Sequence, residues 1–175
     1  MDNSYSRQIT LLILLLLIFA VPQEAFAYSA GKTGSSSTGC GGGSCHGGAN
    51  TVTPSLVGQP SSGYTPGTVY SLTIGGSGGT SGTNGGFNLD TTQGTLSNAG
   101  TNAQIATNGE ATHSNFTSRS WTVDWTSPSS GSGDTTFNLA VNFVDGSGTT
   151  SGDSWGTASW TISEATTSPP PSPYN

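Results

Sequence analysis

The chain has 175 residues, of which only 7% are charged, and its formal net charge is −6. With three Lys and Arg side chains there is no basic patch, so we expect no nucleic-acid partner. Lys, Arg and Glu are also too scarce for a helical or coiled-coil protein. Gly, Ser and Thr make up close to half of the chain, yet 4 Trp, 5 Tyr and 6 Phe favour β-strands joined by Gly-rich turns over disorder.

Residues 1–27 have the features of a secretory signal peptide. Arg7 supplies a short positive region, Ile9–Val21 is an apolar core, and Ala25-Phe26-Ala27 matches an A-x-A cleavage signal. The apolar core is too short for a spanning helix with these flanks. We therefore expect an exported protein, periplasmic, extracellular or on the cell surface, whose mature chain begins at Tyr28 and has no membrane span.

A Gly/Ser-rich segment follows over residues 28–50 and holds both cysteines. Its centre is Gly39-Cys40-Gly41-Gly42-Gly43-Ser44-Cys45-His46-Gly47. In c-type haem attachment two thiols add to the vinyl groups, and the His directly after the second Cys reaches the iron. Four small, flexible residues separate the cysteines here, where the usual spacing has two. The pattern predicts one covalent haem c per chain, held by Cys40, Cys45 and His46.

Two other interpretations of the same residues stay open. In an exported protein Cys40 and Cys45 could form a local disulfide, which would close a small loop and leave His46 without a role. Cys40, Cys45, His46 and His113 could together form a tetrahedral zinc site, although this spacing matches none of the usual zinc patterns.

A bound haem needs a second axial ligand or an open site. Met1 is the only Met and is lost with the signal peptide, so His/Met ligation is excluded. The remaining candidates are His113, the α-amine of Tyr28, Lys32 and water. His113 could instead be a structural residue whose ring forms hydrogen bonds at the end of a strand.

Residues 51–164 show the period-2 alternation of half-buried strands, which predicts an antiparallel β-sandwich of seven to nine strands, one face of each in the core and one in solvent. Four strands are expected around Tyr70–Ile74, Trp121–Trp125, Phe137–Phe143 and Ala158–Ile162, and shorter ones at Val52–Val57, Phe87–Leu89, Thr95–Ser97 and Gln104–Thr107.

Three of the four tryptophans, Trp121, Trp125 and Trp160, lie on the apolar strand faces and are expected in the core, whereas Trp155 could be exposed. Residues 165–175 form a Pro/Ser/Thr-rich tail that should be extended. No nucleophile and base occur in a recognisable catalytic pattern, so we do not expect an enzyme.

Several motifs carry a family resemblance, listed in chain order: Gly63-Tyr64-Thr65-Pro66-Gly67-Thr68-Val69-Tyr70, Gly85-Gly86-Phe87, Thr112-His113-Ser114, Trp121-Thr122-Val123-Asp124-Trp125-Thr126-Ser127-Pro128, Gly131 to Phe137, and Gly152-Asp153. In these the chain resembles reeler-type (reelin N-terminal-like, choice-of-anchor) β-sandwiches of exported prokaryotic proteins. The resemblance covers roughly residues 28–163. It implies an immunoglobulin-like, reeler-like sandwich, varied C-terminal anchors, and an upstream segment like this one, interpreted as a single c-type haem motif. Here four residues separate the cysteines, a wide gap, and we expect no C-terminal anchor.

The sequence thus predicts an exported monohaem c-type protein for electron transfer or redox sensing, with an unidentified redox partner. His46 would be the proximal ligand and His113 the candidate distal ligand. The alternative is a haem-free secreted or cell-surface binding or adhesion module with a Cys40–Cys45 disulfide.

Overall fold

The computed structural model describes residues 28–41 and 46–166, so the predicted signal peptide, Cys45 and most of the tail lie outside the described residues. Within these ranges the chain forms strands and no helix, and hence no helix capable of crossing a membrane. The strands are β1 (Ala49–Asn50), β2 (Val52–Val57), β3 (Val69–Gly78), β4 (Asn84–Thr91), β5 (Thr95–Ser97), β6 (Ala103–Ile105), β7 (Ala111–His113), β8 (Trp121–Thr126), β9 (Thr135–Val144) and β10 (Ser154–Ile162).

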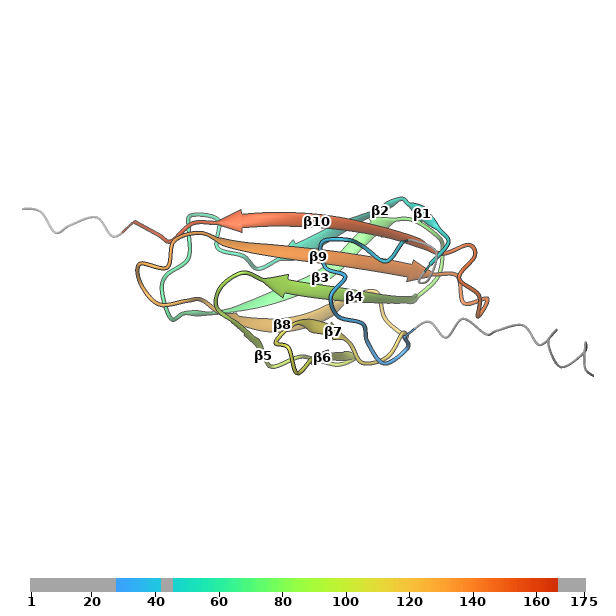
Figure 1. The fold of residues 1–175 in the computed structure, drawn as a ribbon, viewed down its shortest axis with the longest axis horizontal. Coiled ribbons are helices and arrows are strands. Elements are labelled where there is room, and N and C mark those ends of the chain that lie inside the picture. The colour runs from blue at the N-terminus through green and yellow to red at the C-terminus, as the bar shows by residue number, and fades with distance from the viewer. Residues whose placement is uncertain (1–27, 42–45, 167–175) are drawn as a thin grey trace, which may run out of the picture.

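The strands form two sheets that pack face to face (Figure 1). One sheet has six strands in the order β1-β10-β9-β4-β7-β6, and the other has four in the order β2-β3-β8-β5. The pairs are antiparallel with one exception, because the two-residue β1 runs parallel to β10. The predicted all-β sandwich is therefore confirmed, with a mixed six-stranded sheet in place of the purely antiparallel one that we expected.

Aromatic side chains join the two sheets. Trp125 of β8 packs edge-on against Phe137 of β9, with ring centroids 4.9 Å apart, and against Tyr64 at 5.6 Å. Trp121 of β8 packs against Phe87 of β4 at 4.8 Å. These side chains are almost fully buried, so the apolar faces predicted from the alternation form the core. Trp160, also expected there, is partly buried at the edge of this cluster.

The outer face of the six-stranded sheet departs from the predicted alternation. Asn88 of β4 and Asn142 of β9 lie on the faces expected in solvent, yet only 1% and 5% of their surfaces are exposed. Ala140 of β9 is buried in the same way. The reason is that residues 28–41 cross this face, as the blue trace over β9 and β4 shows in Figure 1. We call residues 28–41 the N-terminal segment.

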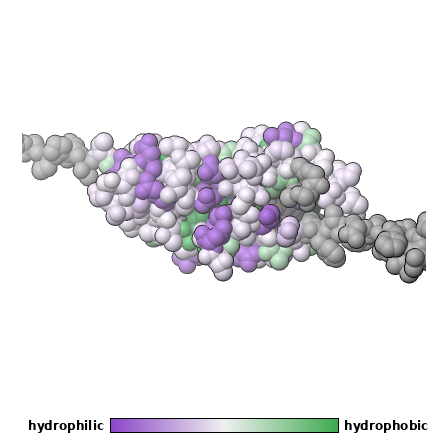
Figure 2. Space-filling model, in the orientation of Figure 1, coloured by the Kyte–Doolittle hydropathy of each residue, from purple (hydrophilic) through white to green (hydrophobic). Residues whose placement is uncertain are grey.

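The visible surface is mostly pale in Figure 2, with a few separate hydrophilic residues. This reflects the many Gly residues and the Ser and Thr side chains on the outer strand faces, whose hydroxyl groups hydrogen-bond with water without carrying charge. The scarcity of charge is thus compatible with a well-packed sandwich.

Two strands were not predicted from the sequence. β1 has two residues and β7 three, which is too short for an alternation to be recognised. β7 matters for the site because His113 is its last residue, and β7 pairs with both β4 and β6.

Candidate functional site

The N-terminal segment is held on the six-stranded sheet by polar side chains of the outer face. Its backbone N–H groups at Lys32 and Ser35 donate to Thr112 Oγ1 (3.1 Å) and Asn88 Oδ1 (2.8 Å). Asn88 and Thr112 are buried and lie on neighbouring strands, β4 and β7. A segment without hydrophobic periodicity is therefore fixed through its own backbone.

Glycine in this segment is required where the backbone meets Trp155 of β10. A Cβ atom at Gly39 or Gly41 would overlap the indole ring. The indole Nε1–H in turn donates to the carbonyl of Gly48 at 3.0 Å. Trp155, which the sequence analysis did not assign to the core, is thus partly buried, and the Gly-rich segment packs against its ring.

A pocket of about 380 Å³ lies between the N-terminal segment and the outer face of the sheet. The start of β4, the end of β9 and the β9–β10 loop form its other walls, together with Phe116. Cys40, His46 and His113, which the sequence singled out as candidate haem residues, all line it. Tyr28 and Lys32, two further candidate axial ligands, line it as well.

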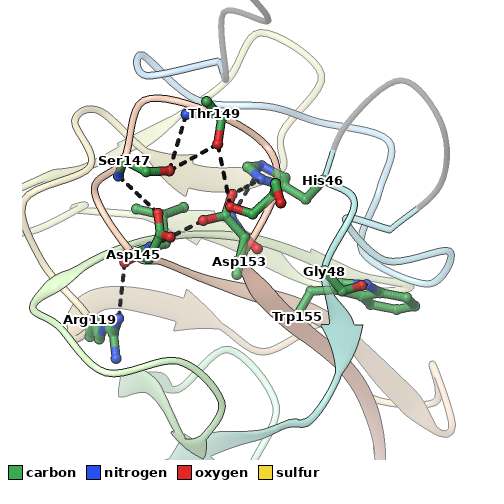
Figure 3. Close-up of polar contacts among 11 residues, drawn as sticks. His46, Gly48, Arg119, Asp145, Ser147, Thr149, Asp153 and Trp155 are labelled. Atoms are coloured by element: carbon green, nitrogen blue, oxygen red, sulfur yellow. Dashed lines mark hydrogen bonds and ion pairs between the residues drawn. The ribbon is translucent and has the colours of Figure 1, made fainter.

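His46 is hydrogen-bonded at both ring nitrogens (Figure 3). Nδ1 lies 2.6 Å from Oδ2 of Asp153, which places the proton on Nδ1, and Nε2 lies 3.1 Å from Nδ2 of Asn142. The other carboxylate oxygen of Asp153 accepts from the backbone N–H of Asp145 at 3.1 Å. Asp153 therefore fixes the orientation of the ring, and Nε2 is the unprotonated nitrogen that faces the amide of Asn142.

Asn142 is a buried side chain with an unused hydrogen-bonding atom. In the described part of the chain its Oδ1 has no partner, whereas Nδ2 faces His46. The opposite orientation of the amide would place Oδ1 on His46 and leave Nδ2 unpartnered. Leaving such a group unpaired costs about 1–3 kcal/mol, and Asn142 lines the pocket, where a ligand can supply the partner.

His113 is also hydrogen-bonded within the protein. Nε2 lies 2.9 Å from the carbonyl oxygen of Tyr28 and therefore donates to it, while Nδ1 accepts from the backbone N–H of Phe87 at 3.2 Å. The ring lies close against Gly86 of β4, where a Cβ atom would come within 2.7 Å of it. His113 thus fastens the N-terminal segment to β4, the structural role that the sequence left open. Its ligation of iron stays a prediction.

The cysteine interpretations are only partly described. Cys40 lines the pocket, and its carbonyl oxygen accepts from the backbone N–H of His46 at 3.1 Å. Cys45 lies outside the described residues, so thioether bonds, a disulfide and the four-ligand zinc site all stay predictions. Within residues 28–41 and 46–166 there is no group of three or more His, Cys, Asp or Glu side chains placed to hold a metal ion.

Sequence reasoning missed Asn142 and Asn88 as site residues, and it named Asp153 within the family motif Gly152-Asp153 but not as a partner of His46. Asn142 and Asn88 were placed on solvent faces because strand alternation carries no information on what covers an outer face. The pairing of Asp153 with His46 is visible only in the folded chain, because the two residues are 107 positions apart in the sequence.

The fold is similar to the reeler domain of F-spondin. A structure of the human domain (fragment 1) aligns with a TM-score of 0.50 at 19% identity, covering 67% of this chain and 91% of that one. The reelin-N domain of F-spondin aligns with a TM-score of 0.50 at 19% identity, covering 68% and 89%. No protein-family model and no curated protein sequence matches the chain. The fold class is therefore reeler-like, and nothing in these comparisons supports the haem motif.

Proposed function

We propose that the mature chain is an exported, reeler-like binding module that takes up a small, largely apolar molecule in the pocket under its N-terminal segment. The observation that carries this proposal is the pocket itself, with the unpartnered buried amide of Asn142 in its wall. Its volume of about 380 Å³ is within the range of small-molecule sites, and Phe116 and Val144 supply apolar surface. In this proposal Cys40 and Cys45 form a disulfide and no cofactor is bound.

Val144→Trp is expected to abolish uptake of a neutral apolar probe, N-phenyl-1-naphthylamine. Val144 ends β9 and lines the pocket, so an indole there occupies the space of the ligand. Probe fluorescence is followed on direct excitation of the dye during titration of mature protein. A saturable signal in the unmodified chain and its loss in the variant support the proposal.

The matched control is Val57→Trp. Val57 lies on β2 in the other sheet and is 63% exposed, so this variant adds the same indole away from the pocket. It should bind the probe like the unmodified chain. Equal binding by both tryptophan variants, or no saturable binding at all, would contradict the proposed site.

One observation favours covalent haem c as a second candidate occupant: the pocket gathers Cys40, His46 and His113 in its lining. The donors fit in part. Histidines that ligate metals commonly donate their other ring N–H to a carboxylate, as His46 Nδ1 does to Asp153. Iron ligation by His46 Nε2 would replace the contact with Asn142, and ligation by His113 Nε2 would break the bond to Tyr28.

In the haem proposal Cys40 and Cys45 form the thioethers and His46 is the axial ligand. Haem would supply one-electron exchange, so the module would then act in electron transfer or redox sensing. Asp153 would keep the imidazole in the tautomer that leaves Nε2 available. The pocket would hold the macrocycle away from bulk solvent.

Intact mass spectrometry separates the two proposals. The chain is expressed with its signal peptide in a host with a cytochrome c maturation system, and the exported protein is purified. A mass lower by two hydrogens is expected for the disulfide module. A gain of one haem mass, with a Soret band that survives denaturation and is lost in Cys45→Ser, supports the haem protein instead.

A further inference from the structure

The mature chain has only two cationic side chains, Lys32 and Arg119, against seven carboxylates. Arg119 is committed to the fold, because its guanidinium donates to the carbonyl oxygens of Thr80, Asn84 and Val144 at 2.8–3.2 Å. Lys32 is therefore the one side-chain cation left for a ligand. It lies in the lining of the pocket.

The position of Lys32 is fixed by its backbone. Its N–H donates to Thr112 Oγ1 and its carbonyl accepts from the same hydroxyl, both at 3.1 Å. The ammonium lies 5.3 Å from the centroid of the Tyr28 ring. Among the described residues no carboxylate forms an ion pair with the Lys32 ammonium.

Asp153, in the pocket lining, and Glu110, which binds the N-terminal segment, each accept hydrogen bonds from other groups, and neither forms an ion pair with Lys32. Asp153 is 3% exposed and accepts from His46 and from the Asp145 N–H. Glu110 accepts from the N–H of Gly34 and from Asn88 Nδ2, at 2.9 and 2.6 Å. In a chain with net negative charge, a cation left unpaired at a pocket wall indicates a ligand with an acidic group.

Large apolar side chains also line the pocket. Tyr28 and Phe116, which are 63% and 46% exposed, are two of the four exposed large hydrophobic side chains among the described residues, and both line the pocket. Cleavage before Tyr28, as the sequence predicts, would add the positive charge of an α-amine at the same wall. The pocket thus combines an aromatic rim with localised positive charge.

We infer that the ligand is an amphipathic organic anion, with a flat apolar body against Phe116 and Val144 and an acidic group at Lys32. This inference rests on the proposed function, because it specifies the ligand class of the same pocket.

Two probes with one skeleton test the inference. 8-Anilino-1-naphthalenesulfonate is N-phenyl-1-naphthylamine with an added sulfonate, so their affinities differ by the contribution of the anion. One partly exposed ion pair, worth up to about 1 kcal/mol, predicts up to about fivefold tighter binding of the sulfonate at low salt. This advantage should shrink as salt is raised, because exposed charges are screened.

Lys32→Gln should lower the affinity for the sulfonate more than the affinity for the neutral probe and so remove the advantage of the sulfonate, whereas Lys32→Arg should keep that advantage. Ser129→Asp is the control for net charge: it also adds one negative unit, but it precedes β9, and the pocket lies beyond the far end of that strand. Equal affinities of the two probes in the unmodified chain would contradict the inference that the ligand is acidic, and so would an unchanged advantage of the sulfonate in Lys32→Gln. Either result would leave the proposed binding pocket unaffected. Failure of both probes to bind would overturn the proposed function as well.

Discussion

Gly41→Ala is expected to detach the N-terminal segment from Trp155 and to weaken binding of N-phenyl-1-naphthylamine at least ~10-fold. A Cβ atom at this position would overlap the indole ring, which is held from the other side by its bond to Gly48. Over-packing of this kind costs about 1–3 kcal/mol. Urea unfolding and probe titration of the mature chain measure the two effects.

Gly47→Ala is the matched control, because its Cβ atom would lie 3.6 Å from the carbonyl oxygen of Thr150, an ordinary contact. This variant should keep both its stability and its affinity for the probe. A second check places Gly41→Ala in a Trp155→Ala background, where the added methyl group finds room. There Gly41→Ala should cost much less than in the unmodified chain. Equal behaviour of Gly41→Ala and Gly47→Ala would show that Trp155 does not hold the segment.

Arg119→Met is expected to lower the free energy of unfolding by about 2–4 kcal/mol, since charge-assisted hydrogen bonds are worth about 1.5–3 kcal/mol each and the site is partly exposed. The guanidinium joins the carbonyls of Thr80, Asn84 and Val144 and stacks on Phe143 at 4.2 Å. Partial burial lowers the pKa of Arg119 below its ordinary value, but the group stays charged at neutral pH.

Arg119→Lys is the control, because it keeps the charge but cannot donate to three carbonyls from a planar fork. Its free energy of unfolding should fall between those of the unmodified chain and Arg119→Met. Urea denaturation of the three proteins measures the order. An Arg119→Met variant as stable as the unmodified chain would show that water satisfies these carbonyls equally well.

The sandwich could be predicted from the sequence where strands are long and alternate cleanly. The pattern of Trp121, Val123 and Trp125 places β8 correctly, and that of Phe137 to Phe143 places most of β9. Both patterns arise because one strand face packs in the core, so they are local in sequence.

The candidate site could be predicted only in part. Cys40 and His46 were found because their spacing is a local motif, and His113 because it is the second His of the chain. The partners that define the pocket, Asn142 and Asp153, are 96 and 107 residues from His46. The N-terminal segment lacks hydrophobic periodicity and docks through backbone N–H groups, which any residue except proline provides, so its docking leaves no pattern in the sequence.

The central claim is that the space under the N-terminal segment is a ligand site. The most direct test is a ¹H–¹⁵N NMR titration of the mature chain with N-phenyl-1-naphthylamine. Binding in the pocket predicts saturable shifts of the Asn142 side-chain amide and of the Gly85 and Gly86 backbone amides, which line it, with Thr73 and Thr122 in the other sheet unchanged. Shifts confined to the four-stranded sheet, or none that saturate, would contradict the claim.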